Sequence, residues 1–176
     1  MKHILSRCTL ACSLLTIGLV SCSDDNEHNS KYNSLPPTFT NMVATELETG
    51  SNTLHAGKKF VVALEQSQKG QLLYKGTYAW NLSPEVEGNS QKYTTVVFYD
   101  NTPDAPTDTL LINTPGTYTL TFTGKYDASG HTTIWTNSGA ANNATYWADG
   151  SGKVNYSSRG LYGFTAVATK KIVVNE

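Results

Sequence analysis

The sequence predicts an all-β fold, a single antiparallel β-sandwich, on three observations. Apolar and polar residues alternate along several short segments, which is the pattern of strands with one buried face. These segments are rich in threonine and tyrosine, which favour the pleated surface of a sheet. Glycine and proline turns separate them at the short spacing of sandwiches and barrels, and no segment shows the apolar period of a helix.

The individual strands follow from the same alternation. It is clearest in residues 117–123, where Tyr118, Leu120 and Phe122 face one way and four threonines face the other. The run 92–99 is apolar on both faces, so we expect a strand enclosed by the rest of the fold. In chain order, the predicted strands and short strand-like pieces are 59–65, 71–74, 77–82, 92–99, 117–123, 162–168 and 170–174.

The N-terminus has the pattern of a bacterial export signal. Lys2 and Arg7 precede an apolar run, residues 8–20, which is shorter than the roughly 20 residues of a membrane-spanning helix. The run ends in Leu19-Val20-Ser21-Cys22, which resembles a bacterial lipobox. This resemblance implies cleavage of residues 1–21 and lipidation of the new N-terminal cysteine.

Cys22 is therefore the expected membrane anchor, and the mature domain has no other cysteine because Cys8 and Cys12 leave with the signal. Two or more acyl chains hold a protein stably on a bilayer, and a lipobox cysteine typically carries three. The acidic residues 23–27 resemble the surface-export signal of Bacteroidetes lipoproteins, which implies the extracellular side of the outer membrane. The alternative is a merely charged linker on a protein that faces the periplasm.

The mature chain then divides into two parts. Residues 22–38, the lipidated cysteine and a polar stretch with a proline pair, are expected to form a flexible tether. Residues 39–176 have the length of a single domain.

A short motif makes the fold prediction more specific. Pro115-Gly116-Thr117-Tyr118 resembles the corner before strand F of immunoglobulin-like and PKD-like domains, and Trp80 is similar to their core tryptophan on strand C. The resemblance implies that the Tyr118 hydroxyl bonds to the backbone of the corner and that Leu120 replaces a core cysteine. Val62 or Leu64 would fill the volume of the other cysteine.

A long insertion before the last strand departs from that family. Residues 128–161 exceed the usual hairpin loop and are rich in Gly, Asn, Ser and Thr, with embedded aromatic residues. Flat aromatic rings beside amide and charged groups suit a sugar ligand. The alternative is that the rings pack the insertion onto the sandwich. The candidate ligand residues are Trp135, Asn137, Tyr146, Trp147, Asp149, Tyr156 and Arg159.

Other functions are disfavoured by composition and spacing. The whole chain has a net charge of −1, and loss of Lys2 and Arg7 leaves −3, with no basic cluster for nucleic acid. The mature histidines lack the spacing of a metal site, and we expect no cofactor. Glu85 and Glu87 fit a solvated loop, and no nucleophile elbow is present, so we do not expect an enzyme.

These observations favour a non-catalytic binding module of the outer membrane, with glycan as the leading ligand class. The alternative is a structural or accessory subunit that docks on a partner protein of the outer membrane, for example by strand addition.

Overall fold

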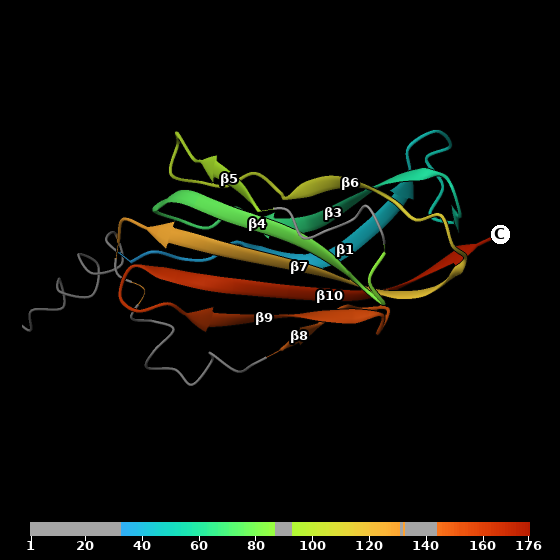
Figure 1. Ribbon diagram of the computed structural model, residues 1–176. Helices are drawn as coiled ribbons and strands as arrows, with labels where there is room; N and C mark the ends of the chain where they lie inside the picture. Colours follow the sequence, from blue (N-terminus) through green and yellow to red (C-terminus); the bar gives the residue numbers. More distant parts are fainter. Residues whose placement is uncertain (1–32, 87–92, 131, 133–143) are drawn as a thin grey trace, which may run out of the picture.

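The computed structural model describes residues 33–86, 93–130, 132 and 144–176, which form two antiparallel sheets packed face to face (Figure 1). This confirms the predicted all-β sandwich. Among the described residues, no helix is long and apolar enough to cross a bilayer. The strands are β1 (Thr38–Glu46), β2 (Leu54–His55), β3 (Lys59–Gln68), β4 (Leu73–Ser83), β5 (Thr94–Val97), β6 (Thr107–Leu111), β7 (Gly116–Ala128), β8 (Thr145–Tyr146), β9 (Gly152–Ser158) and β10 (Gly163–Asn175).

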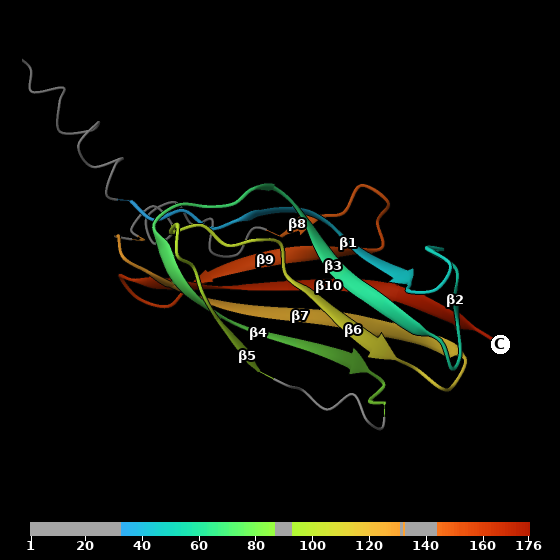
Figure 2. The same ribbon diagram turned by 90° about the horizontal axis from the view of Figure 1, so that it is seen from above.

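The two sheets differ in width. The smaller has the order β1-β3-β6, and the larger has the order β5-β4-β7-β10-β9-β8, with β2 pairing in parallel with the end of β10. Strands β5 and β6 therefore lie along one side of the sandwich, and β1, β8 and β9 along the other (Figure 2). Each side of the sandwich is formed by edge strands of the two sheets.

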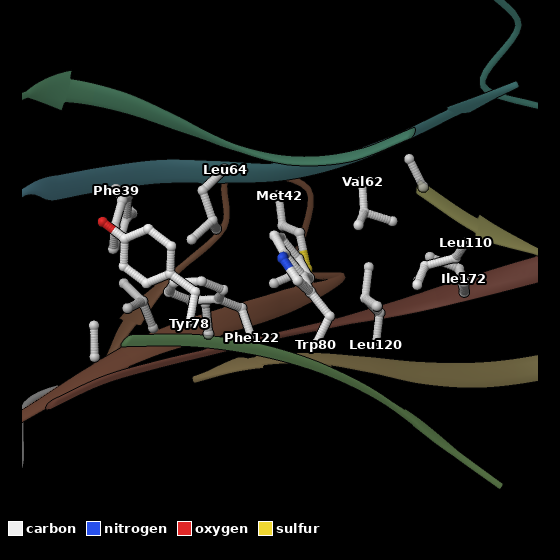
Figure 3. Close-up of a cluster of buried hydrophobic side chains, with 14 of the residues drawn as sticks. Phe39, Met42, Val62, Leu64, Tyr78, Trp80, Leu110, Leu120, Phe122 and Ile172 are labelled. Atoms are coloured by element: carbon white, nitrogen blue, oxygen red, sulfur yellow. The ribbon is translucent and has the colours of Figure 1, made fainter. Parts of the chain in front are cut away.

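The core lies between the sheets and is built from the inward residues of both (Figure 3). On β7, Tyr118, Leu120 and Phe122 are buried, as their alternation predicts. They pack against inward residues of the opposite sheet, including Met42 and Val62 (Figure 3). The sequence prediction of this core face is confirmed.

Several predicted strands are longer than their alternation indicates. The pieces 71–74 and 77–82 belong mainly to one strand, β4, which has a register irregularity between Leu73 and Lys75. Segments 162–168 and 170–174 likewise form the single strand β10.

The prediction of an enclosed strand at 92–99 was wrong. In the described part of this run, β5 is the outermost strand of the larger sheet, and Thr94, Thr95 and Val97 are exposed. The side chains of this segment that face the core are those of Val96, which is partly buried, and Phe98, which is buried.

The end of the predicted tether is part of the domain. Ser34 is fully buried and its hydroxyl accepts a hydrogen bond from the Gly130 amide. Leu35 pairs with Gln71, and Pro37 is buried. Residues 34–37, which the sequence assigned to the tether, thus pack on the domain, while residues 22–32 lie outside the described part of the chain.

The corner before β7 has the expected hydrogen bond. The Tyr118 hydroxyl donates to the Thr114 carbonyl over 2.8 Å. Trp80 lies on β4, which pairs directly with β7, and its ring meets Phe122 at 4.9 Å between centroids.

Candidate functional site

Trp147, a predicted ligand residue, lies in the core. Its side chain is 2% exposed, and its Nε1–H donates to the Thr169 carbonyl over 2.7 Å. Gly152 makes this possible, since a Cβ there would lie 1.8 Å from the Thr169 oxygen and 2.6 Å from the Trp147 Nε1. The ring packs the β8–β9 hairpin onto β10 and offers no face to a ligand, so the packing alternative holds for this residue.

Tyr156 is also a packing residue and not a ligand platform. It is 8% exposed and its ring stacks on Phe39 at 6.3 Å between centroids. Its hydroxyl donates to the Pro37 carbonyl over 2.7 Å and accepts from the Phe39 amide over 3.2 Å. Burial raises the pKa of Tyr156 to about 12. The side chain therefore joins β9 of one sheet to the start of β1 in the other.

The other predicted residues that the structure describes, Tyr146, Asp149 and Arg159, do not form one site. Tyr146 is 68% exposed on β8, with the Lys153 ammonium 5.7 Å from its ring centroid. Asp149 lies in the turn before β9, whereas Arg159 follows β9 and pairs with Asp127 over 3.1 Å. The two charged residues are thus at opposite ends of one strand.

Trp135 and Asn137 lie outside the described residues. Asp149 accepts hydrogen bonds from the Ser151 hydroxyl and amide within its own turn and from the Lys170 ammonium of β10. These bonds, the Ser151 hydroxyl first, lower the pKa of Asp149 to about 2. Asp149 is a turn-forming residue in this arrangement.

A concave site is present on the opposite side of the sandwich, between β5 and β6. A cavity of about 670 Å³ lies there. Its wall is the segment 98–106, which crosses from one sheet to the other. The Leu73 amide of β4 donates to the Asn101 carbonyl over 2.9 Å, and the Leu64 amide of β3 donates to the Pro106 carbonyl over 3.0 Å. The wall is thereby fixed to both sheets.

The floor of this cavity is aromatic. Tyr78 and Trp80 rise from β4 toward the sheet of β1 and β3 (Figure 3), and Phe98 packs beside Tyr78. The Tyr78 hydroxyl is buried, and its polar neighbour is the equally buried Tyr126 hydroxyl. Burial raises the pKa of Tyr78 to about 12, although the nearby Tyr126 hydroxyl offsets part of the rise.

The rim of the cavity is acidic and includes the almost fully exposed side chain of Tyr99, which is 98% exposed. Asp100 is held by Thr102, whose hydroxyl donates over 2.9 Å and whose amide donates over 3.2 Å, and these bonds lower the pKa of Asp100. Asp104 and Asp108 also line the cavity. The described residues of the lining are Tyr78, Trp80, Thr94, Val96, Val97, Phe98, Tyr99, Asp100, Thr102, Asp104, Ala105, Pro106, Thr107 and Asp108.

Sequence reasoning placed Tyr78 on the predicted strand 77–82 and Trp80 in the core, and it missed the cavity that they form with the proline-containing segment 98–106. The signal present in the sequence was the spacing of Asp100, Asp104 and Asp108 through that proline-containing loop. A loop with regularly spaced carboxylates beside aromatic strands is a hint, but only the fold places these residues around one space.

A second groove lies between β1 and β10, with a volume of about 560 Å³. The Lys170 ammonium donates to Asn41 over 3.3 Å and to Asp149 over 3.2 Å, which links β1 to the β8–β9 turn. The polar groups of this cluster are thus occupied by one another. Within the described part of the chain, no three His, Cys, Asp or Glu residues are placed to hold a metal ion.

Comparisons with protein families, with curated proteins and with solved structures found no significant match to this chain.

Proposed function

We propose that the mature chain is a lipoprotein of the outer membrane, anchored through Cys22 and facing the cell exterior, whose β-sandwich binds carbohydrate in the cavity between β5 and β6. The observation that carries the proposal is the combination of an aromatic floor, hydrogen-bonding carboxylates at the rim and the fully presented ring of Tyr99. Sugars offer apolar C–H faces for rings and hydroxyl groups for acceptors, and ligand pockets typically combine both kinds of surface.

The fold is proposed to be immunoglobulin-like or PKD-like. The order β5-β4-β7-β10, the Tyr118 corner and Trp80 on β4 support this, since they match the C′-C-F-G order, tyrosine corner and strand C tryptophan of such domains. The β8–β9 hairpin then is an addition at the outer edge of the last strand.

A binding role is favoured over glycoside hydrolysis. A glycosidase needs a carboxylic acid whose pKa is raised so that it can protonate the leaving oxygen. The pKa of Asp100 is lowered by the Thr102 hydrogen bonds, which is the opposite of that requirement.

The test of carbohydrate binding is retention on a glycan array by the mature chain in detergent. We expect Tyr99→Ala to weaken retention at least tenfold, which is about 1.4 kcal/mol. The matched control is Tyr146→Ala, which removes an exposed tyrosine from the other side of the sandwich. No retained glycan, or equal retention by wild type and Tyr99→Ala, contradicts the proposal.

The anchor is tested separately. Mass spectrometry of the native protein should find Cys22 as the first residue with a diacylglycerol mass, and Cys22→Ala should release the protein from membranes. An unmodified cysteine, or a start at another residue, contradicts the anchoring. Protease treatment of intact cells then reports whether the domain faces outward.

A second candidate is docking on a partner protein by strand addition. Large exposed hydrophobic residues gather on and beside the edge strand β5, namely Tyr93, Val97 and Tyr99. An added strand would hydrogen-bond to β5 and cover these side chains. Co-purification of a membrane partner that Val97→Lys abolishes, without any glycan retention, would favour this candidate.

A further inference from the structure

The described chain begins at one end of the sandwich, which we call the N-terminal end. Residue 33 lies beside the turn between β3 and β4, since the backbones of Leu35 and Gln71 exchange two hydrogen bonds, over 3.1 and 3.0 Å. The starts of β4 and β10 pair with the end of β7, so the β9–β10 turn is at this end too. The C-terminus is at the opposite end (Figure 1).

Large apolar side chains are exposed at the N-terminal end. Leu35 is 37% exposed, and Leu161 and Tyr162 of the β9–β10 turn are each 53% exposed. The segment 128–130 links them, because its amides donate to the hydroxyl of Ser34, next to Leu35, and to the carbonyl of Tyr162. We call these three side chains the end surface. None of them is among the described residues that line the cavity between β5 and β6.

The turn that carries Leu161 and Tyr162 has its carbonyl groups hydrogen-bonded within the protein. The Gly160 carbonyl accepts from the Thr132 and Ser158 hydroxyls over 2.8 and 3.0 Å. The next two carbonyls accept from backbone amides over 2.8 and 2.9 Å. Backbone polar groups without a partner are strongly disfavoured at the apolar layer of a bilayer. The turn thus exposes apolar side chains whose own carbonyl groups already have partners.

The proposed lipid anchor limits how far this end can be from a membrane. Residue 33 follows Cys22 by 11 positions, a length that spans at most about 40 Å when fully extended. The sandwich itself is about 40 Å long, since β7 has 13 residues at roughly 3.3 Å each. The C-terminal end could therefore reach the bilayer only if the connecting chain ran extended along the whole domain. The N-terminal end reaches it over a much shorter span.

We infer that the end surface, Leu35, Leu161 and Tyr162, docks on the membrane in which Cys22 is anchored, so that the N-terminal end of the sandwich faces the lipid head groups. The inference rests on the anchor of the proposed function and goes beyond it, since an anchor alone does not orient a domain. Tyrosine rings favour the head-group level, and leucine favours the apolar layer beneath it. Because the anchor already holds the domain at the bilayer, three side chains suffice for a populated contact.

The first experiment places the lipidated mature chain in vesicles of phosphatidylethanolamine and phosphatidylglycerol that carry a nitroxide quencher on the head group. A fluorophore on Leu161→Cys reports on the end surface. The matched control is a fluorophore on Val173→Cys, which replaces a side chain that is 58% exposed at the C-terminal end. Acylated Cys22 takes no label and the mature chain has no other cysteine, so labelling is specific. We expect quenching at Leu161→Cys to be at least about threefold stronger than at Val173→Cys.

A second reporter leaves the end surface itself unchanged. Ser129→Cys is exposed in the segment that links the three side chains, and its label should also be quenched. Adding Leu35→Asp and Leu161→Asp together should reduce that quenching to the level of Val173→Cys, because charged side chains are excluded from the apolar layer. Both positions are exposed, so the urea midpoint should change little, and glycan retention should be unaffected.

The outcomes separate the anchor from the docking. Equal quenching at Leu161→Cys and Val173→Cys in the lipidated protein overturns the docking and leaves the anchor standing. An unmodified Cys22, found by mass spectrometry, overturns the anchor, and the inference falls with it. Equal quenching together with contact between Leu161→Cys labels on separate copies would overturn the docking and assign the end surface to self-association.

Discussion

Replacing Trp147 by alanine is expected to destabilise the domain strongly and to leave ligand binding intact. The side chain is 2% exposed and its indole N–H is bonded to the Thr169 carbonyl of β10. A buried tryptophan removes up to about 250 Å² from water, worth about 6 kcal/mol at roughly 25 cal/mol per Å². A compact denatured state reduces this by roughly 10–40%. The expected loss is therefore about 3–5 kcal/mol, the range measured for such truncations.

The assay is urea unfolding monitored by circular dichroism. For a slope of about 2 kcal/mol per M, the midpoint should fall by about 2 M while the slope stays constant. Trp147→Phe keeps an aromatic ring but loses the N–H donor. Its urea midpoint should lie between those of wild type and Trp147→Ala. The adjacent Tyr146→Ala, at an exposed position on β8, should stay within about 0.5 kcal/mol of wild type.

The result that would refute the reasoning is a Trp147→Ala midpoint within about 0.3 M of wild type, since a buried ring cannot be removed at so small a cost. Glycan retention by the folded variant, measured well below its midpoint, should equal that of wild type. Loss of glycan retention by a Trp147→Ala variant of unchanged stability would instead show that Trp147 belongs to the ligand site.

Three further predictions concern stability. Tyr118→Phe should lower the free energy of unfolding by about 1 kcal/mol, because the corner hydrogen bond is lost; an unchanged urea midpoint would contradict the role of that bond. Gly152→Ala should cost about 2–3 kcal/mol, because its Cβ would lie 1.8 Å from the Thr169 oxygen, and a wild-type melting temperature would show that the hairpin shifts freely. The pKa of Glu46 is lowered from 4.5, chiefly by its hydrogen bond with His55, so its stabilising effect is present above pH 4.5 and is lost as the pH falls through the lowered value. The difference in unfolding free energy between wild type and Glu46→Gln should therefore shrink in acid; a difference independent of pH would exclude this coupling.

The sequence predicts best those strands whose buried face alternates strictly. This is why β3, β4 and β7 were found, and why β1 was missed. Its inward residues Phe39 and Met42 are three apart because the pairing with β3 shifts register between Phe39 and Asn41. An irregularity of this kind breaks the period of two that sequence reasoning depends on.

The position of a strand in its sheet is harder to predict than its existence. An apolar run on both faces indicated an enclosed strand at β5, yet Val97 is 55% exposed while Phe98 is buried. Whether a strand lies at the edge of its sheet depends on its pairing with distant segments. The local apolar pattern does not contain this information.

The same limit explains why Trp147 and Tyr156 were taken as ligand residues although both are buried. A tryptophan among amide and hydroxyl residues has the same local sequence whether its ring stacks on a sugar or packs a hairpin onto a sheet. What decides is where the polar atom finds its partner. For Trp147 the partner is a backbone carbonyl of β10, and for Tyr156 it is the backbone of Pro37 and Phe39. Both partners are far along the chain and invisible to local pattern.

Those distant contacts also suggest why the insertion and the cavity are on different sides. The larger sheet extends past the smaller one through β9 and β8, and its insertion residue Tyr156 reaches across to the start of β1. Lys170 and Asp149 bridge toward Asn41 further along the same side. The insertion thus links the two sheets on the side of β1, β8 and β9. On the side of β5 and β6 the connection is the wall segment 98–106, which is fixed at both ends and leaves about 670 Å³ between them. The described lining of the cavity includes no residue of the insertion, so any effect of the insertion on the proposed binding site would act through the packing of the two sheets.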